Sequence, residues 1–274
     1  MPTRSVALSL CLAMLALAGC TSSPVSLPDG VELSVFQNRS DYATRTLVIG
    51  VANGSPEPIT VTRVEFSSPR FDGTAVWDRG TDLRAGGQVD LRVPLPVSVC
   101  GVAGAPSIRI IFTTASGLDG AATVTPDDPR DRLDEISREE CLVEEVARLA
   151  TITVGDDVDW AAGAHAPASV SIDVAPTGAA GELTVTAVRQ TVLLALVDDN
   201  NARVPSLPHA GTVRFVPSRC DPHAVAEDKL GTVFPVEVSV DGTAGTISVG
   251  TISVAASDDT RVEIYDYIAD FCGY

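Results

Sequence analysis

Lysine is nearly missing from this chain of 274 residues, in which Lys229 is the only one. Nineteen basic residues stand against 36 acidic ones, which gives a formal net charge of -17 at pH 7. Proteins that bind nucleic acid or anionic lipid headgroups neutralise phosphate with clustered Lys and Arg side chains. Because the chain has no such cluster, we expect no nucleic-acid partner and no electrostatic attraction to a membrane surface.

Aromatic residues and long apolar runs are also scarce. Phe, Trp and Tyr make up 5% of the chain, which leaves few rings for the exposed platforms of a carbohydrate-binding face once the cores are filled. The uncharged N-terminal run over residues 5–20 is shorter than the roughly 20 residues that a helix needs to span a bilayer. No other stretch is long and apolar enough, so we expect no membrane-spanning helix.

The common catalytic motifs are absent as well. The sequence has no G-x-S-x-G, no S-x-x-K before Lys229, no G-x-x-x-x-G-K and no H-E-x-x-H, so the usual nucleophile, phosphate and zinc templates are missing. Three histidines supply few candidate general bases. We therefore expect a protein that is not an enzyme and that holds no cofactor, apart from a divalent metal considered below.

The N-terminus has the organisation of a secretion signal. Arg4 precedes an apolar run over residues 6–17, and the small residues Ala18 and Gly19 follow. The segment Leu17-Ala18-Gly19-Cys20 resembles the lipobox of bacterial lipoproteins, in which the cysteine receives a diacylglycerol and becomes the first residue of the mature chain.

This resemblance implies a signal peptide over residues 1–19 and lipidation at Cys20. Two acyl chains suffice for stable attachment, so the protein is expected on the outer face of the cytoplasmic membrane, with residues 20–30 as a lipidated tether rich in Ser and Pro. The abundance of Ala, Gly, Val, Asp and Arg resembles the secreted proteins of high-G+C actinobacteria.

Four cysteines remain once Cys11 is removed with the signal and Cys20 is acylated. An even number outside the cytosol predicts disulfides. Four cysteines allow three connectivities. Two domains of similar size favour the sequential one, in which Cys100 pairs with Cys141 and Cys220 pairs with Cys272.

Residues 31–126 alternate apolar and polar side chains in the manner of short strands. Turn signals such as Asn53-Gly54 and Ser68-Pro69 separate these runs. A change of phase near Thr62-Arg63 predicts a β-bulge. The spacing favours an antiparallel β-sandwich, with the core side chains Leu47, Ile49, Val51, Ile59, Val61, Val64, Phe66, Val89, Leu91, Val93, Leu95, Ile108, Ile110 and Phe112.

Residues 127–150 are dense in charge and poor in β-branched residues, which predicts a helix. Asp127 or Asp128 would cap it and Pro129 would lie in its first turn. We expect a connector packed on the first domain and held by Cys141; the alternative is an acidic helix that docks a partner. The predicted apolar face contains Ile136, Val143, Val146, Ala147 and Leu149.

Residues 151–274 repeat the strand pattern and predict a second sandwich. Residues 151–154 are its first strand, and Ile247 to Val254 change phase at Gly250. Its last strand is expected to contain Val262 and Ile264 and to lead to Tyr265 and Tyr267. The fold class that follows is all-β, with two tandem Ig-like antiparallel β-sandwiches joined by a short helical connector.

The densest group of chemically active side chains follows Cys220. A short helical turn from Pro222 would place His223 and Glu227 on one side, with Asp221 or Asp228 nearby, and His209 would join across a hairpin. Such a set would bind a divalent metal. The alternative, which we favour, is an ordered loop in which Asp221 caps the turn and the carboxylates are solvated.

These observations favour a non-catalytic binding or assembly module anchored in the cell envelope, with another envelope protein as its partner. An edge strand of either sandwich would accept a partner strand, and the sequence does not identify which edge is open. Two alternatives remain: a metal-binding or metal-dependent protein centred on His223, and a substrate-capturing lipoprotein of a transporter.

Overall fold

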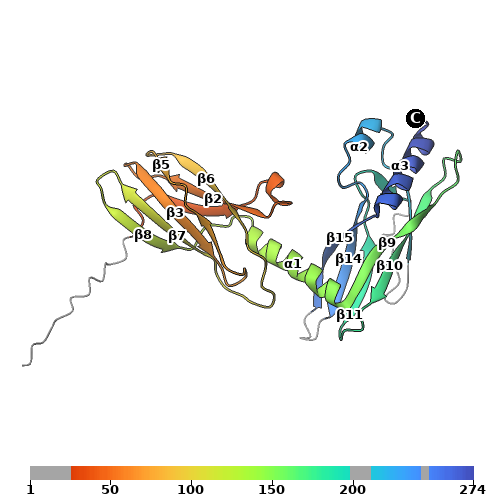
Figure 1. Cartoon of the computed structure of the whole chain (residues 1–274), viewed down its shortest axis with the longest axis horizontal. Coiled ribbons are helices and arrows are strands. Elements are labelled where there is room, and N and C mark those ends of the chain that lie inside the picture. Colours follow the sequence, from red (N-terminus) through yellow and green to blue (C-terminus); the bar gives the residue numbers. More distant parts are fainter. Residues whose placement is uncertain (1–25, 198–210, 242–246) are drawn as a thin grey trace, which may run out of the picture.

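The computed structural model describes residues 26–197, 211–241 and 247–274. The chain is mostly β, and every ladder between its named strands is antiparallel (Figure 1). The predicted signal peptide 1–19, Cys20 and His209 lie outside the described residues. No helix in the described ranges is both long enough and apolar enough to cross a membrane.

Two sheets contribute side chains to the first buried apolar cluster. The predicted bulge is confirmed, because the register of β3 (Ile59–Ser67) with β7 (Ser107–Thr114) shifts between Val61 and Arg63. One sheet has the order β1-β2-β6, with β1 (Val31–Phe36), β2 (Thr46–Asn53) and β6 (Gln88–Pro94). The other has the order β4-β3-β7-β8, with β5 also paired to β3; its strands are β3 (Ile59–Ser67), β4 (Thr74–Trp77), β5 (Thr81–Leu83), β7 (Ser107–Thr114) and β8 (Asp119–Val124).

Two further sheets contribute to the second apolar cluster. The predicted incoming strand is present as β9, which begins at Ala150. The first of these sheets has the order β12-β13-β10-β9, with β9 (Ala150–Asp159), β10 (Ala168–Pro176), β12 (Leu194–Leu196) and β13 (Gly211–Pro217). The second has the order β11-β14-β15, with β11 (Glu182–Val188), β14 (Val233–Asp241) and β15 (Ile247–Ala255).

The helix of the connector, α1 (Arg132–Leu149), is shorter than the predicted segment. Asp127 bridges to β1, and the Asp128 carboxylate accepts hydrogen bonds from the backbone amides of Arg132 and Leu133, both at 2.9 Å. The Asp128 side chain therefore caps the first helix amides, although the residue at the N-cap position is Asp131, and Pro129 lies before the helix and not in its first turn. The predicted apolar face was partly wrong, because Leu142 is buried whereas Val143 is 52% exposed.

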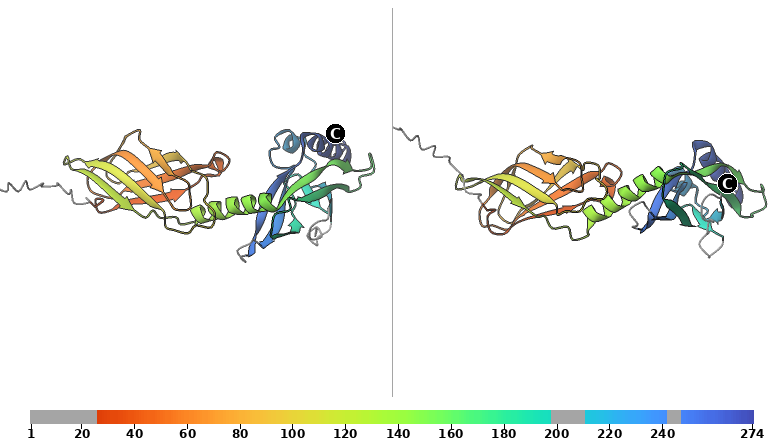
Figure 2. Two further views of the ribbon diagram at one scale, coloured as in Figure 1. Left: turned by 60° about the horizontal axis from the view of Figure 1, so that its bottom comes forward. Right: turned by 90° about the horizontal axis from the view of Figure 1, so that it is seen from below.

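Helix α1 belongs to both apolar clusters and not to the first alone. Leu133 and Ile136 pack with the first cluster, whereas Leu142, Val146 and Leu149 pack with the second. Figure 2 shows the helix running from one β region to the other. Each half of α1 thus contributes to the core of a different β region.

The final segment was predicted as a strand and is instead a helix, α3 (Asp258–Cys272). Its buried residues Thr260, Ile264, Tyr267 and Ile268 follow the helical spacing of three and four residues. Ser257 accepts a hydrogen bond from the Thr260 amide, and acidic residues fill the first turn, as expected at a helix start. Gly273, with φ 74°, supplies the left-handed C-cap.

Both disulfides follow the sequential pairing. Cys100 is bonded to Cys141 and Cys220 to Cys272, over sequence separations of 41 and 52 residues. The first ties the loop after β6 to the middle of α1. The second ties the segment before α2 (Pro222–Ala226) to the end of α3.

Candidate functional site

Strand β15 is the outer strand of its sheet and has an open edge. It pairs with β14 through nine consecutive residues without a shift in register, and no other strand pairs with it. On its other side, within the described residues, no hydrogen bond reaches the backbone of 248–255. An antiparallel edge strand leaves alternate N–H and C=O groups directed away from its neighbour, so β15 presents a row of groups that are available to another strand.

The residues of β15 provide none of the usual protection of an edge. Proteins commonly guard such strands with charged residues, proline, bulges or short length. Residues 242–257 contain no charged residue and no proline. A long, regular and uncharged edge is the kind that pairs with another chain.

Other edges of these sheets are short, charged, bulged or covered. Backbone bonds to Asp127 cover β1. Helix α3 covers β9 at Gly155 and Val158, through Thr260 and Glu263. The first residues of β9 lie beside residues 252–255 of β15, with a further cavity between them. Strands β4 and β12 have four and three residues. Protective residues also occur on β6 (Asp90, Arg92, Pro94), β8 (Asp119) and β11 (Glu182, with a register shift between Val185 and Ala187).

A duplicated pentapeptide explains the change of phase noted at Gly250. The sequence Gly-Thr-Ile-Ser-Val occurs at 245–249 and again at 250–254. Because the repeat has an odd length, equivalent residues of the two copies face opposite sides of the strand. Ile252 and Val254 are buried, whereas Val249 is 72% exposed. The strand therefore has an apolar side chain on its outer face as well as on its inner one.

Cavities lie along the open edge between β15 and α1. One of about 590 Å³ is lined by Thr251, Ile252 and Ser253 of β15, by α1, and by the loop at 97–100. A second of about 600 Å³ continues along residues 248–251. Both include Glu139 and Thr251, so together they form one groove, which we call the α1–β15 groove.

Glycine at position 250 permits the close approach of helix and strand. A Cβ atom on Gly250 would lie 2.6 Å from Cδ2 of Leu142. The helix thus contacts the inner face of β15 there, while the side chains of Thr251 and Ser253 remain exposed. Helix α1 borders the open edge without covering it.

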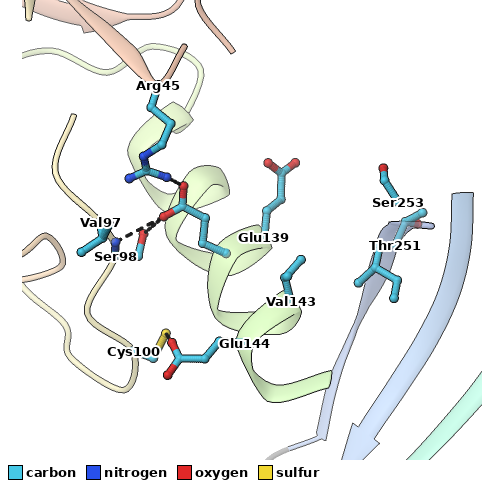
Figure 3. A pocket seen from close by; sticks show the side chains of 11 residues that line it. Arg45, Val97, Ser98, Cys100, Glu139, Val143, Glu144, Thr251 and Ser253 are labelled. Carbon is cyan, nitrogen blue, oxygen red and sulfur yellow. Dashed lines mark hydrogen bonds and ion pairs between the residues drawn. The ribbon is translucent and has the colours of Figure 1, made fainter. Parts of the chain in front are cut away.

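Figure 3 shows how the walls of the groove differ. Glu139 and Val143 project from α1 toward Thr251 and Ser253 of β15. On the opposite side of the helix, the Glu140 carboxylate forms an ion pair with Arg45 and accepts a hydrogen bond from the Ser98 hydroxyl at 2.6 Å. These contacts, together with the Cys100–Cys141 disulfide, fix the 97–100 loop against the helix.

Two carboxylates of the groove are weakly engaged. Glu139 is 56% exposed and its carboxylate lies 3.8 Å from the Arg132 guanidinium, at the limit of an ion pair. Glu144 takes part in no ion pair within the described ranges; its carboxylate lies 3.2 Å from Sγ of Cys100. Arg138, which lines the second cavity, is paired with Asp134 at 3.1 Å. Available negative charge therefore exceeds available positive charge along the helix side of the groove.

The four residues of the predicted metal site do not form a ligand group. In the described part of the chain, no three His, Cys, Asp or Glu side chains are placed to hold a metal ion. The predicted helical turn is present as α2, and Asp221 caps it by accepting a hydrogen bond from the His223 amide at 3.0 Å. His223 and Glu227 are exposed.

Asp228, the fourth candidate ligand, is occupied by its own loop. Its carboxylate accepts hydrogen bonds from the amides of Leu230 and Gly231 and, at 2.9 Å, from the Tyr265 hydroxyl. Burial raises the pKa of Tyr265, and the bond to Asp228 raises that pKa further. The segment therefore has the contacts of the ordered loop that was the alternative interpretation.

The site that the structure reveals was not identified from the sequence. The sequence places Val249 and Thr251 only within the run Ile247 to Val254, which changes phase at Gly250, and Glu139 only within the predicted helix. The repeated pentapeptide and the uncharged run 242–257 were the available signals, because they leave an edge without protection.

Comparison with known proteins gives no family for this chain. No protein-family model matches it, and no curated protein matches it. Similar solved structures include the CupB2 chaperone of Pseudomonas aeruginosa, with 12% identity over 78% of this chain and 94% of that chain and a TM-score of 0.22. A chain of the CsuC-CsuE chaperone-tip adhesion subunit pre-assembly complex of Acinetobacter baumannii has 10% identity over 78% and 93%, with a TM-score of 0.21. The sporulation control protein Spo0M of Bacillus subtilis has 8% identity over 87% and 94%, with a TM-score of 0.22. Scores this low do not establish a shared fold, and they carry no function to this chain.

Proposed function

We propose that this chain is a lipid-anchored protein of the cell envelope that binds or assembles another envelope protein and performs no catalysis. It docks an extended segment of that partner onto β15 by strand addition. The observation that carries this proposal is the nine-residue, uncharged and unpaired edge of β15 beside a groove. In strand addition, main-chain hydrogen bonds supply affinity, and side chains at alternate positions supply specificity.

The proposed architecture is two tandem Ig-like β-sandwiches joined by α1. Two antiparallel sheets supply side chains to each apolar cluster, which supports the sandwich arrangement. On this view the first sandwich is a spacer and the second presents the docking edge.

Lipidation at Cys20 would place the groove on the side of the first sandwich that faces away from the membrane. The chain enters β1 at Val31, and β1 is about 20 Å long at the usual rise per residue. The end of β1 that is far from Val31 lies beside the start of α1. At that far end, the Gln37 side chain accepts a hydrogen bond from Arg132 at 2.9 Å. Residues 26–30 and the helix therefore meet opposite ends of β1, which suits a module that presents its edge to other envelope proteins.

A substrate-capturing lipoprotein of a transporter is the weaker alternative. Such proteins commonly alternate strands with helices, which produces parallel sheets. Every ladder between the named strands of this chain is antiparallel, so we do not propose that function.

The proposal is tested by photo-crosslinking in living cells from a photoreactive amino acid placed at Thr251, followed by mass spectrometry. We expect one reproducible protein partner, crosslinked through a single segment. Val249→Lys should abolish the crosslink because a lysine on the edge opposes strand pairing. Val262→Lys is the matched control: Val262 is also an exposed valine, but it lies on α3.

A Cys20→Ala form, which cannot be acylated, should lose the partner in cells and keep its fold. Crosslinks that persist unchanged in Val249→Lys would refute docking at β15. Partner capture that is the same for Cys20→Ala would refute the lipid anchor as a requirement while leaving the docking edge in place.

A further inference from the structure

We infer that the segment docked in the α1–β15 groove carries basic side chains on the face that meets α1. This inference rests on the proposed function and adds the chemistry of the partner to it. The partner is thus an extended, positively charged stretch of another protein.

Charge complementarity along the groove is the first argument. The helix side of the groove contains Glu135, Glu139, Glu140 and Glu144, whereas its cations are Arg45 and Arg138. Both arginines are already paired, Arg45 with Glu140 and Arg138 with Asp134. The strand side is neutral, because residues 242–257 contain no charge. Glu140 and Glu135 are likewise paired, with Arg45 and Arg132, and Glu144 lies beside Cys100. Glu139 is therefore the carboxylate that projects toward β15 and is available to an incoming cation, with no competing basic group on the strand.

The spacing of the helix side chains is the second argument. Glu139 and Val143 are four residues apart on α1, which is about 6 Å along the helix axis. Residues i and i+2 of a strand, which share a face, are separated by about 6.6 Å. Glu139 and Val143 both project toward β15. A strand added to that edge can therefore place a basic side chain over Glu139 and an apolar side chain over Val143.

Pairing between two copies of this chain does not fit the same groove. A second β15 would bring no cation, since the strand is uncharged, and each chain has a formal net charge of -17. Like charges at the helix side of both copies would oppose the approach. A cationic segment of a different protein complements the charge of the groove, whereas a second copy of this chain does not.

The test uses the whole chain with Cys20→Ala and three synthetic peptides of alternating valine and threonine. One valine position in each peptide carries arginine, glutamine or glutamate. Fluorescence anisotropy measures the dissociation constants, with unlabelled peptide as competitor. We expect the arginine peptide to bind about twofold to threefold more tightly than the glutamine peptide, the effect of one partly exposed ion pair. The glutamate peptide should bind most weakly.

Variants of the protein assign the effect to the groove. Glu139→Gln should weaken the arginine peptide by about twofold to threefold and leave the glutamine peptide unchanged. Glu57→Gln, which removes an exposed carboxylate outside the groove, is the matched control. Val249→Lys should weaken the arginine peptide more than Val249→Glu does, because only the lysine repels it.

The possible results separate this inference from the proposed function. Equal binding of the three peptides, all lost in Val249→Lys, would overturn the cationic segment and support strand docking at β15. Binding that is absent, or that is unaffected by Val249→Lys, would overturn both. A preference for arginine that disappears in Glu139→Gln supports both.

Discussion

Two edge strands, β1 and β15, contact the same helix, but only β1 has backbone hydrogen bonds on its outer side. The open side of β1 is paired with the chain itself: the Val35 amide donates to the Asp127 carbonyl at 2.8 Å, and the Asp127 amide donates to the Leu33 carbonyl at 2.9 Å. Among the described residues, no segment makes a backbone hydrogen bond to the outer side of β15 at 248–255, although the start of β9 lies beside it. The backbone of a single residue, Asp127, thus pairs with the open side of β1, whereas the helix that follows leaves the edge of β15 open.

The difference shows that adjacency to a helix does not by itself protect an edge. Closure of β1 depends on backbone groups placed at hydrogen-bonding distance, whereas α1 offers β15 only side chains. The Leu142 side chain lies close to Gly250, yet this contact leaves the N–H and C=O groups of the edge without hydrogen-bond partners among the described residues. The predictions that follow alter this contrast, beginning with the largest expected effect.

Removal of the Cys100–Cys141 disulfide should have the largest effect. A loop closed over 41 residues stabilises by about 4 kcal/mol in the chain-entropy model. Cys100→Ser with Cys141→Ser should lower the free energy of unfolding by about that amount and release the 97–100 wall of the groove. Chemical denaturation measures the loss. Replacing Cys220 and Cys272 in the same way is the comparison, and peptide binding at β15 should survive that change better.

Shortening a buried side chain in either half of α1 should destabilise only the β region that this half packs against. Leu142→Ala should cost about 3 kcal/mol, as expected for a buried leucine, and should increase amide exchange in β14 and β15. Leu133→Ala should cost a similar amount but increase exchange in the strands of the first cluster. Equal exchange changes across the chain after either substitution would contradict the assignment of the helix halves to different cores.

Asp128→Ala should weaken the backbone pairing that covers the outer edge of β1, so that this edge becomes open like that of β15. Loss of its two bonds to helix amides should cost about 1 kcal/mol and loosen the segment that covers β1. Hydrogen exchange of the Val35 amide is the measurement, and faster exchange is expected. Asp131→Asn serves as control, because Asp131 lies at the N-cap with φ 50° and makes no side-chain cap bond, and asparagine tolerates that conformation. Equal acceleration by both variants would show that the cap does not hold the edge closed.

Lowering the pH should destabilise the first β region through protonation of Asp41, and this is the smallest effect that we expect. Burial raises the pKa of this carboxyl, but hydrogen bonds from the Asn38 amide and the Arg92 guanidinium outweigh burial, so the pKa is lowered from its ordinary value of 3.8. A lowered pKa contributes stability above the unfolded value, and that stability is lost as the pH falls through the folded value. Asp41→Asn should therefore destabilise at neutral pH, and the difference from the unmodified chain should shrink below about pH 4. Urea unfolding across this range is the measurement, with Asp29→Asn as the exposed control.

Alternation of side chains was sufficient to predict most strands, the bulge at Thr62-Arg63 and the helix of the connector. The failure at α3 has a physical cause, since Val262 and Ile264 alternate like a strand while Ile264 and Ile268 share a helical face. The N-cap Ser257 and the C-cap Gly273 decide between these patterns. Burial of Leu142 in place of Val143 depended on which β region each half of α1 would meet, and a helical period alone does not contain that information.

The open edge of β15 illustrates a second limit. Whether a strand is central or outermost depends on sheet order, which arises from contacts between distant parts of the chain. The sequence contained the neutral run 242–257, but the meaning of that run changes with position: in a central strand it is ordinary, and on an edge it is exposed to pairing.

Because each half of α1 buries apolar side chains in a different β region, the helix also provides a path for mechanical load between them. Tension applied to a strand held at β15 would pass through Leu142 and Val146 into the helix, and from there through Leu133, Ile136 and the Cys100–Cys141 bond into the first β region. Rotation of either β region away from its half of α1 would expose some of these apolar groups to water, which opposes that motion. A protein anchored at one end and loaded at the other would then transmit force as one body.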